Sequence, residues 1–476
     1  MNKNEIYEVL IEDISNDGEG IGHFEDKNGS GKIVVFVKDT AVGDYVKIKL
    51  IKCKKKYAFG KLIEIITPSL YRVAPVCEKA ASCGGCAMMH MSYEKQLEYK
   101  FNKVKNCLSR IGGVKDVEKL MEPIYGMKEP YHYRNKMQFP VGLDKEGNVT
   151  IGFYAGRTHS IIDLKSCAIA HPVNDFIVKN LRQWLGKWQE KTGTFIYNET
   201  TNKGLVRHIL TRVGFTTGEL MVCIVINGKK YPDEACEKEL IEAVEKSVNE
   251  YNNSKNKADL TISLESLCYN INTENTNKIL GKKGGVTYKN GFISDYIGDV
   301  KFNISPMSFY QVNPAQTKVL YDKALEYAEL SKNEVVWDMY CGIGTISLFL
   351  AKNAKKVYGV EIVPQAIEDA EVNAKINNID NVEFICGKAE DVKIKEAADI
   401  VVVDPPRKGC DSALLDTISN MNPKRLVYVS CDPATLARDV AYLCDKGFNV
   451  QKVSVVDQFG HSTHVETVVA LHRTGM

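Results

Sequence analysis

Apolar and polar residues are patterned most regularly in the last third of the chain. From about Pro306 onward, helical stretches separate five short apolar segments: Val335–Met339, Val357–Glu361, Val382–Ile385, Ile400–Asp404 and Leu426–Ser430. Apolar strands that alternate with helices predict a doubly wound parallel sheet. Two further strands, Val450–Val456 and Val465–Leu471, are joined by a short connection, which predicts an antiparallel hairpin. We therefore expect a Rossmann-like α/β domain at residues 301–476.

Residues 1–67 follow a different pattern, in which glycine turns separate short alternating strands such as Ile33–Val37. This pattern predicts a five-stranded β-barrel of the OB type. The basic run Lys52–Lys56 precedes Tyr57 and Phe59. On these residues alone, contact with RNA and a solvated hairpin edge are equally good interpretations.

Residues 68–300 predict a mixed α+β central domain. A helix is expected at about Tyr93–Ile111, and the segment near 93–122 is expected to pack on the C-terminal domain. The Asn/Lys-rich stretch Asn249–Lys257 reads as a surface loop. Strands are expected at Lys136–Val141, Val149–Tyr154, Val206–Val213 and Glu219–Ile226.

Composition adds limits on the class of protein. The chain has 476 residues, 44% of them hydrophobic, and 62 basic against 60 acidic residues, so that RNA binding requires local basic patches. Its longest apolar stretch, Leu220–Ile226, is too short to span a bilayer, and the amino-terminal sequence does not resemble a signal peptide. The 14 cysteines then indicate reduced thiols. We expect a cytoplasmic monomer with no membrane partner.

A strand, a glycine turn and a helix follow one another in VVWDMYCGIGTISLFLA, residues 335–351. Gly342 and Gly344 allow a ligand to approach the backbone, and Glu361 ends the next strand, where a carboxylate can bind ribose hydroxyls. A nicotinamide dinucleotide is the competing ligand. Ser347 at the third glycine position weakens that alternative, and Asp338 suits a methionine ammonium group better than a pyrophosphate. Short glycine motifs remain hypotheses.

Three further residues lie where a parallel sheet gathers ligands. Asp404 begins the DPPRKG turn at the carboxyl edge of the fourth strand, a turn typical of methyltransferases acting on planar nitrogenous substrates. Cys431 follows the fifth strand at the start of a helix, whose dipole is expected to lower the pKa of the thiol. It is a buried filler, a metal ligand or a nucleophile. Glu466 starts the last strand and faces Cys431 if that strand is antiparallel.

The motifs FYQVNP, DMYCGIGT, DPPRKG, SCDP and HVET resemble, in this order, those of the RNA (uracil-5-)-methyltransferase family. The resemblance implies a class I methyltransferase domain, a TRAM barrel at residues 1–67 and a central RNA-binding domain at 68–300. It implies that Cys431 is the nucleophile, that Glu466 is the proton-abstracting base and that Phe309 lies near the flipped base. The S-adenosylmethionine site would comprise Gln311, Tyr340, Glu361 and Asp404.

This chain departs from the family pattern near its end. Gln458, Gly460 and Ser462 replace Met, Pro and Thr of the family's usual sequence. These changes bear on the packing of the loop and not on the role of Glu466.

The stretch CEKAASCGGC places three cysteines within ten residues, and a fourth follows far along the chain. Their spacing alone leaves zinc and a 4Fe–4S cluster equally open, since both accept four thiolates. The family resemblance favours 4Fe–4S. The predicted ligands are Cys77, Cys83, Cys86 and Cys167.

The cysteine cluster and the TRAM-like barrel resemble the branch of the family that modifies 23S rRNA, which is the expected substrate. One alternative is a tRNA 5-methyluridine methyltransferase. Others are an exocyclic-amine methyltransferase, which needs no nucleophilic cysteine, and a non-catalytic iron–sulfur RNA-binding protein. The stretch YRNKMQF at residues 133–139 mixes basic and aromatic side chains, which suits both RNA binding and an ordinary amphipathic strand.

Overall fold

The structure is a computed structural model that describes residues 1–25, 31–156 and 158–475. The chain forms two compact units. The first comprises Met1–Asn102, Phe153–Ile162 and Phe459–His464, and the second comprises Lys103–Gly152, Asp163–Gln458 and Val465–Met476. The boundaries expected at residues 67 and 300 stay a prediction. None of the helices in the described ranges is long and apolar enough to cross a membrane.

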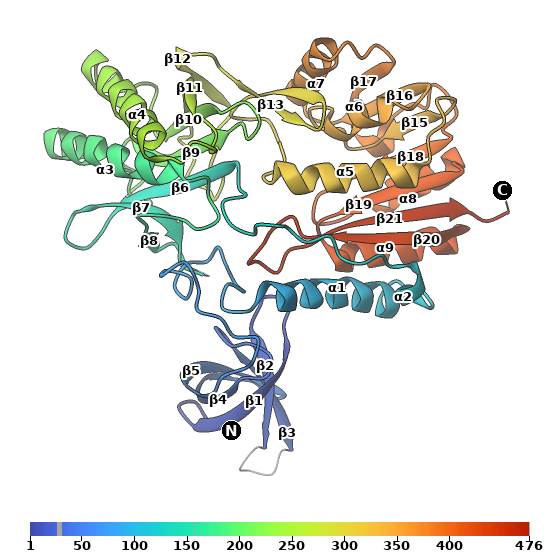
Figure 1. The fold of residues 1–476 in the computed structure, drawn as a ribbon, viewed down its shortest axis with the longest axis horizontal. Helices are drawn as coiled ribbons and strands as arrows, with labels where there is room; N and C mark the ends of the chain where they lie inside the picture. Colours follow the sequence, from blue (N-terminus) through green and yellow to red (C-terminus); the bar gives the residue numbers. More distant parts are fainter. Residues whose placement is uncertain (26–30, 157, 476) are drawn as a thin grey trace. The chain divides into compact units, whose positions relative to one another are not determined.

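The first unit contains the expected barrel, a closed ring of five strands in the order β1-β2-β3-β5-β4 (Figure 1). Alternate residues of each strand point inward, and Val35, Ile48 and Ala58 are among those that fill the interior. The strands β3 and β5 are parallel, and the other neighbours are antiparallel. The strands are β1 (Ile6–Ile14), β2 (Gly20–Glu25), β3 (Lys32–Val37), β4 (Tyr45–Cys53) and β5 (Tyr57–Thr67).

A seven-stranded sheet forms the central part of the chain, in the order β12-β11-β10-β9-β6-β7-β8. Its strands are β6 (Lys136–Leu143), β7 (Val149–Tyr154), β8 (Ile161–Asp163), β9 (Val206–Val213), β10 (Glu219–Ile226), β11 (Ser263–Ile271) and β12 (Lys283–Lys289). The sequence pattern missed β8, β11 and β12. The helix expected near residue 93 is confirmed as α1 (Tyr93–Arg110), and α2 (Val117–Leu120) contacts the edge strand of the C-terminal sheet.

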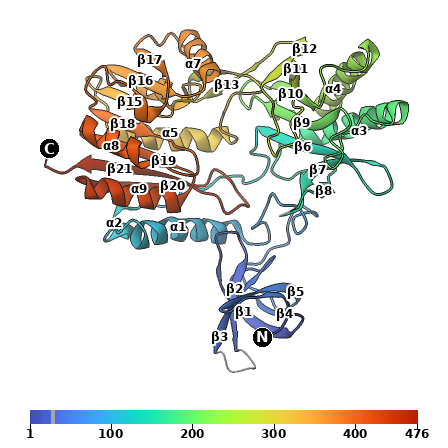
Figure 2. The same ribbon diagram turned by 180° about the vertical axis from the view of Figure 1, so that it is seen from behind.

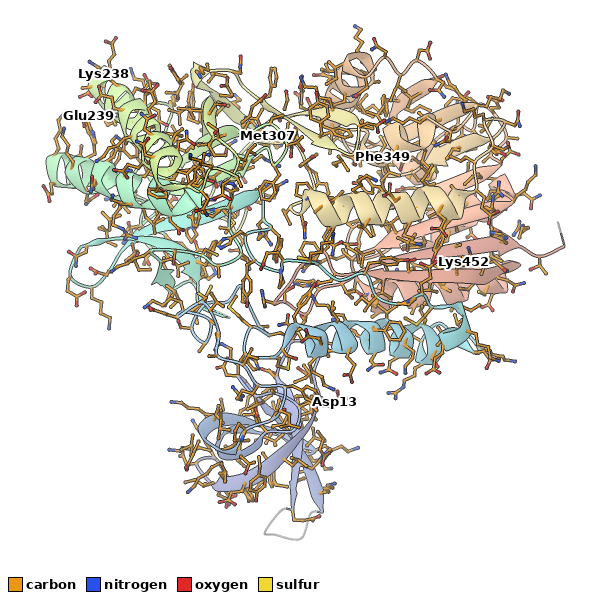
Figure 3. The ribbon with its side chains drawn as sticks, viewed as in Figure 1. Asp13, Lys238, Glu239, Met307, Phe349 and Lys452 are labelled. Atoms are coloured by element: carbon orange, nitrogen blue, oxygen red, sulfur yellow. The ribbon has the colours of Figure 1, made fainter. Side chains whose placement is uncertain are left out.

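Two long helices, α3 (Val173–Thr192) and α4 (Glu234–Ser254), pack against each other beside the central sheet (Figure 1). The side chain of Glu239, labelled in Figure 3, accepts a hydrogen bond from Trp188 Nε1 at 3.0 Å. The surface loop expected at Asn249–Lys257 is wrong in part, because α4 continues to Ser254. Asp233 caps the start of this helix, and Tyr251 packs among buried side chains at its end, so packing overrides the low helix propensity of the asparagines.

The C-terminal sheet has the order β17-β16-β15-β18-β19-β21-β20. The last strand of the chain, β21, runs antiparallel to both of its neighbours, β19 and β20. This confirms the predicted doubly wound sheet with a terminal hairpin. The strands are β15 (Val335–Asp338), β16 (Lys356–Glu361), β17 (Val382–Cys386), β18 (Ile400–Val403), β19 (Arg425–Ser430), β20 (Phe448–Val456) and β21 (Glu466–Arg473). The hairpin of β13 (Ile293–Ile297) and β14 (Val300–Ile304) lies in the chain between the central sheet and this domain.

Helices cover both faces of this sheet. The helix α5 (Pro314–Ala328) contacts β19, β20, β21 and α6 (Thr345–Ala351). The helices α8 (Ser412–Met421) and α9 (Pro433–Asp445) contact each other, and α9 contacts β19 and β20 (Figure 2). The remaining helix, α7 (Pro364–Ile376), contacts β14, β16 and β17.

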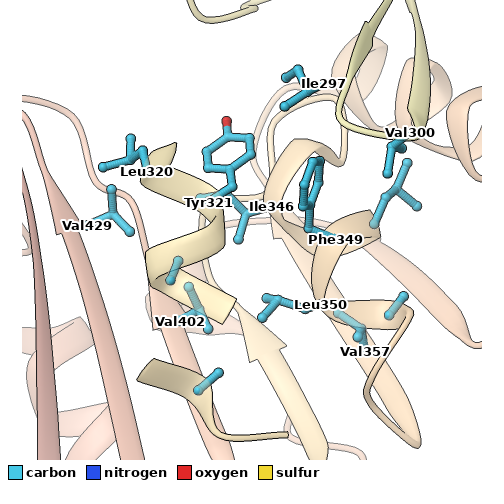
Figure 4. Close-up of a cluster of buried hydrophobic side chains, with 14 of the residues drawn as sticks. Ile297, Val300, Leu320, Tyr321, Ile346, Phe349, Leu350, Val357, Val402 and Val429 are labelled. Carbon is cyan, nitrogen blue, oxygen red and sulfur yellow. The ribbon is translucent and has the colours of Figure 1, made fainter. Parts of the chain in front are cut away.

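A buried apolar cluster joins the sheet to α5 and α6 (Figure 4). The rings of Tyr321 and Phe349 meet edge to face with centroids 5.4 Å apart. Tyr321 also donates a hydrogen bond to Thr345 Oγ1 at 3.0 Å, in the first turn of α6. Because α6 starts at the glycine turn, this packing holds the turn against the sheet.

Candidate active site

Four parallel strands end on residues that the sequence analysis selected. Asp338 ends β15 and Glu361 ends β16, while Asp404 and Cys431 directly follow β18 and β19. The carboxyl ends of parallel strands meet at one edge of a sheet, where α/β proteins bind ligands. The fold therefore brings these residues to a common edge.

The glycine turn after β15 is held by two carboxylates. Gly342 and Gly344 have φ values of 55° and 84°, in the left-handed region that favours glycine. Glu361 Oε2 accepts a hydrogen bond from the amide of Gly342 at 3.3 Å. Asp338 is fully buried and accepts a hydrogen bond from the hydroxyl of Ser347 at 2.6 Å, while burial raises its pKa to about 6. Ser347, which stands at the third glycine position, thus serves to orient Asp338.

A buried network holds the loop that carries Asp404. The carboxylate of Asp439, in α9, accepts hydrogen bonds from the Tyr428 hydroxyl at 2.6 Å and the Cys410 amide at 2.8 Å. Tyr340 lies next to Cys410, and burial raises the pKa of its hydroxyl. Burial and the charge of Asp338 raise the pKa of Asp404 to about 7. The sequence analysis did not select Asp439, since a charged residue on a helix gives no local sign that its side chain is buried.

Cys431 and Glu466 come together across two neighbouring strands. Ser430 pairs with Thr467 in the antiparallel ladder between β19 and β21, so the next residue, Cys431, is level with Glu466. Glu466 is 2% exposed, and burial, followed by the charge of Asp404, raises its pKa to about 8. The orientation of the last strand, and hence the predicted facing of the two residues, is confirmed.

The expectation that the helix lowers the pKa of Cys431 is wrong. Burial raises the pKa of this thiol to about 11, and the charges of Glu466 and Asp404 contribute to the rise, while Arg407 opposes them. The Asp432 side chain caps α9 by accepting from the amides of Ala434 and Thr435, both at 3.0 Å. Burial and the two carboxylates therefore dominate at this thiol. Arg407, within DPPRKG, was also missed; its place directly after the Pro-Pro turn was the available signal.

The segment before α5 carries Gln311 and is held by the central sheet. The Nδ2 atom of Asn135, a residue that is 3% exposed, donates to the Gln311 carbonyl at 3.0 Å. The fully buried Arg212 guanidinium of β9 donates to the Ser308 carbonyl. Gln311 is itself buried, whereas Phe309 is 70% exposed. Met307, labelled in Figure 3, belongs to the same segment.

Because the sequence analysis predicts that Gln311 binds S-adenosylmethionine, we expect Asn135→Ala to weaken that binding about three- to tenfold. The loss of a buried hydrogen bond costs roughly 1 kcal/mol, and here it loosens the backbone of Gln311. Calorimetric titration with S-adenosylmethionine measures the effect. Asn180→Ala is the matched control, because Asn180 is also buried and donates to Phe176 and Ser247, away from the sheet edge. Equal weakening by both variants would contradict the prediction.

We also predict that Glu466→Gln stabilises the protein at high pH. The carboxyl ionises near its ordinary value of 4.5 in the unfolded chain, whereas its pKa in the folded chain is about 8, so the unfolded chain binds fewer protons between these values. Stability then falls as pH rises from about 4.5 to 8. The variant escapes this loss. Its Tm should exceed that of the wild type by several degrees at pH ~9, because each kcal/mol of stability raises Tm by ~2–4 °C, and by little at pH ~5. Thermal unfolding without ligand tests this, and a gain that is equal at both pH values would contradict it.

The residues that depart from the family pattern, Gln458, Gly460 and Ser462, lie in the loop between β20 and β21. Gln458 is fully buried, and its Nε2 atom donates to Thr317 Oγ1 of α5 at 2.7 Å. The backbone carbonyl oxygen of Gln458 accepts a hydrogen bond from Asn313 Nδ2 at 3.2 Å. Ser462 donates to the Phe459 carbonyl at 2.8 Å. The glutamine that replaces the family's usual methionine thus supplies one side-chain hydrogen bond, to Thr317 of α5.

Three of the four predicted metal ligands lie in the first unit, and the fourth lies in the second. Cys77 lies close enough to Cys83 to raise the pKa of its thiol, an effect smaller than that of burial, and the Gly85 amide donates to Cys83 Sγ at 3.4 Å. Cys86 lies in the same unit, whereas Cys167 belongs to the second unit. Among the residues that the structure describes, no group of three or more His, Cys, Asp or Glu side chains is arranged to hold a metal ion.

The sheet order and the residues at its carboxyl edge define a class I methyltransferase domain that depends on S-adenosylmethionine. A family model described as tRNA (uracil-5-)-methyltransferase matches residues 295–474, and a TRAM domain model matches residues 2–63. The chain belongs to the RNA (uracil-5-)-methyltransferase family. The predictions of this family, of the TRAM barrel and of an RNA methyltransferase are thereby confirmed.

Relatives cover nearly the whole chain. A protein of Clostridium tetani named uncharacterized RNA methyltransferase is 48% identical over 478 residues, covering 98% of this chain and 96% of the relative. A Bacillus cereus protein of the same name is 47% identical over 476 residues, with coverages of 99% and 97%. The solved structure of a tRNA (uracil-54, C5)-methyltransferase from Pyrococcus abyssi with S-adenosyl-L-homocysteine is similar with a TM-score of 0.75. It is 25% identical and covers 98% of this chain and 100% of that chain.

Proposed function

We propose that this enzyme forms 5-methyluridine in 23S rRNA, with Cys431 as nucleophile and Glu466 as base. One observation carries the proposed reaction: a thiol directly after one strand comes level with a buried carboxyl on the neighbouring strand, at the ligand edge of a methyltransferase sheet. A methyltransferase that acts on an exocyclic amine has no use for this pair, because the amine nitrogen is itself a nucleophile.

The chemistry of uracil explains why both residues are needed. Carbon 5 is a weak nucleophile, so the Cys431 thiolate first adds to carbon 6 and makes carbon 5 enolate-like. Carbon 5 then accepts the methyl group, and the Glu466 carboxylate removes the proton that carbon 5 still carries. The electron pair of that C–H bond re-forms the ring double bond and expels the thiolate. Because carbon 6 is attacked from the face of the ring, the uridine must leave its stack.

S-adenosylmethionine supplies the methyl group as an electrophilic sulfonium. Gln311, Tyr340, Glu361 and Asp404 are proposed to bind it. The support is that Glu361 and Asp404 end or follow neighbouring strands, and that Glu361 is fixed by the Gly342 amide. A bound sulfonium would also offset the carboxylate charges that raise the pKa of Cys431.

A tRNA is the second candidate substrate. The matching family model and the similar Pyrococcus abyssi structure are both named for tRNA, and that structure matches over 98% of this chain, barrel included. A TRAM-like barrel therefore does not by itself favour rRNA. The support for 23S rRNA is the resemblance of the cysteine cluster to that branch of the family.

Labelled S-adenosylmethionine distinguishes these possibilities. The purified enzyme is incubated with rRNA and, separately, with tRNA, and the product nucleosides are mapped by mass spectrometry. We expect 5-methyluridine in the large-subunit rRNA. Label on tRNA alone would replace the proposed substrate, and label only on a nitrogen or a ribose would overturn the mechanism. Gel filtration of the same protein tests the expected monomer.

We further propose that Cys77, Cys83, Cys86 and Cys167 bind a 4Fe–4S cluster, with zinc as the alternative. Four thiols suit either centre, and the proximity of Cys77 to Cys83 supports a shared ligand site. The centre would hold the surrounding loops and takes no part in methyl transfer. Protein purified without oxygen should contain iron and acid-labile sulfide and absorb visible light. Colourless protein with one zinc would establish the alternative, and Cys83→Ala should lose the metal in either case.

A further inference from the structure

The helix that follows the proposed nucleophile also contacts the loop that carries Asp404. This helix, α9, begins at Pro433, two residues after Cys431, and packs against β19 (Figure 2). The loop follows β18 and contains the DPPRKG motif, residues 404–409. Both segments belong to the second compact unit. A single helix therefore borders both the thiol and the loop that contains Arg407.

The side chains of two consecutive residues of α9 bind the backbone of this loop. Arg438 Nη2 donates to the carbonyls of Lys408 and Cys410, at 3.0 and 3.1 Å. The amide of Cys410 in turn donates to Asp439 Oδ2 at 2.8 Å. A Cβ added at Gly409 would lie 2.6 Å from Arg438 Nη2 and 2.6 Å from Asp439 Oδ2, which is too close for any side chain. The loop therefore lies directly against α9.

The same two side chains hold each other in place. Arg438 Nε donates to Asp439 Oδ1 at 2.8 Å, and Asp439 is 1% exposed. A buried carboxylate needs its hydrogen-bond partners, because its removal from water is costly. Asp439 accepts its other hydrogen bonds from the Tyr428 hydroxyl and the Cys410 amide. The guanidinium of Arg438 is thus oriented toward the loop carbonyls by a carboxylate that is itself fixed.

One turn earlier in α9, Thr435 extends the contact to Arg407. Its hydroxyl donates to the Arg407 carbonyl at 3.1 Å and also lies 3.2 Å from the carbonyl of Asp432. A hydroxyl has one proton to donate, so the Thr435 contact is weaker than those of Arg438. We call Thr435, Arg438 and Asp439 the α9 clamp.

The position of Arg407 matters because of its charge. The charges of Asp404 and Glu466 raise the pKa of Cys431, and that of Asp404 also raises the pKa of Glu466, while Arg407 lowers both. A guanidinium favours a thiolate and a carboxylate, the two ionised forms that the proposed reaction uses. Since the energy between two charges falls with their distance, the place of the loop backbone affects both reacting groups.

We propose that the α9 clamp positions Arg407 beside Cys431 and Glu466, with Arg438 as the main positioning residue. The clamp acts on the reaction through Arg407 and performs no chemical step of its own. The proposal rests on the proposed function in that the thiolate and the carboxylate are the reacting groups. It adds a positioning role for a helix whose side chains the motifs of the family do not include.

Alkylation of Cys431 tests the clamp without RNA. The full-length protein reacts with iodoacetamide at pH ~8.5, well below the pKa of Cys431 of about 11, so the rate follows the thiolate fraction. Mass spectrometry follows the peptide that contains Cys431. Withdrawing a charge by ~2 Å from a distance of ~6 Å raises the pKa of a neighbouring thiol by roughly 0.5 near a protein surface, so Arg438→Met should react about threefold more slowly.

Arg473→Met is the matched control. Arg473 also donates to two backbone carbonyls, those of Lys446 and Ser419. It ends β21, at the opposite end of that strand from Glu466 and hence away from the ligand edge. Its replacement should leave the alkylation of Cys431 unchanged. Thermal unfolding of every variant checks that the protein remains folded.

A double variant shows whether Arg438 acts through Arg407. Arg407→Met should slow alkylation more than Arg438→Met does, and the addition of Arg438→Met to it should cause no further change. Arg438→Lys retains the charge but not the fork of donors, so it should react as slowly as Arg438→Met. Thr435→Val should slow the reaction by a smaller factor, and Thr435→Ser, which keeps the hydroxyl, should restore it.

Three results of the alkylation experiment would overturn the proposal. The first is a wild-type rate in folded Arg438→Met. The second is an effect of Arg438→Met that persists when Arg407 is absent, which would mean that Arg438 acts on the thiol by another route. The third is a wild-type rate in Arg438→Lys, which would assign the effect to the charge of Arg438 alone.

Methylation of RNA separates this proposal from the proposed function. If each pKa rises by about 0.5, Arg438→Met should lower kcat/KM about tenfold at pH ~7, where both groups must ionise, and about threefold at pH ~9.5, where Glu466 is already ionised. An equal loss at both pH values, or a raised KM for RNA with unchanged kcat, would contradict the positioning role. If the wild type transfers no methyl group to uracil, the proposed function fails, while alkylation still decides the role of the α9 clamp.

Discussion

Replacement of Cys431 by alanine is expected to lower methyl transfer to RNA by at least ~10⁴-fold, with S-adenosylmethionine binding retained. Without the thiol, carbon 5 of uracil lacks the adduct that makes it nucleophilic, and loss of a covalent nucleophile costs several orders of magnitude. Single-turnover transfer of a labelled methyl group measures the loss. Cys444→Ala is the control, because Cys444 is a partly buried cysteine near the end of α9.

A covalent trap tests the same role of Cys431 without a rate measurement. RNA that carries 5-fluorouridine cannot lose its carbon 5 substituent as a proton, so the wild type should stop at the methylated adduct. This adduct should persist in denaturing electrophoresis, and Cys431→Ala should form none. Substantial residual activity in the alanine variant, or a trapped complex with it, would show that another residue adds to the base.

Replacement of Glu466 by glutamine is expected to block the second half of the reaction. The thiol can still add and the methyl group can still be accepted, but no carboxylate removes the carbon 5 proton. A covalent protein–RNA complex should therefore accumulate with ordinary uridine, and turnover should fall ~10²- to 10⁴-fold, the range for a positioned general base. Quenched samples resolved by denaturing electrophoresis measure the complex. Loss of turnover without any accumulated complex would place the role of Glu466 before methyl transfer.

The raised pKa values also give this pair a distinct pH dependence. Glu466, with a pKa of about 8, and Cys431, with a pKa of about 11, are both protonated at neutral pH in the free enzyme. Both must be ionised to act, so kcat/KM, which reports the free enzyme, should rise with pH up to about 11, and most steeply below about 8. Arg407 lowers both pKa values, and a bound sulfonium adds a second positive charge. The proposed catalytic pair is thus protonated in the free enzyme at neutral pH, and binding of the sulfonium should favour its ionisation.

Much of this candidate site can be predicted from the amino-acid sequence alone. The apolar segments that end in Asp338, Glu361 and Asp404 predict strands with their polar ends at one edge, because the order of a doubly wound sheet leaves little choice. The strand that starts at Glu466 could be placed opposite Cys431 for the same reason. By contrast, β11 and β12 were missed although they have 9 and 7 residues, since neither shows a regular alternation of apolar and polar residues.

What the sequence by itself determined is the set of elements, their order and the chemical groups at the sheet edge. Only the tertiary structure decided how the pKa values of those groups are shifted and which hydrogen bonds hold their loops. The sign of the pKa shift at Cys431 depends on burial and on carboxylates from two other strands, and neither quantity is present in a local pattern. Asn135 fixes the Gln311 carbonyl from 176 residues away, and Asp439 holds the Asp404 loop from within a helix. Hydrogen bonds between distant segments depend on packing, and packing exists only once the chain has folded.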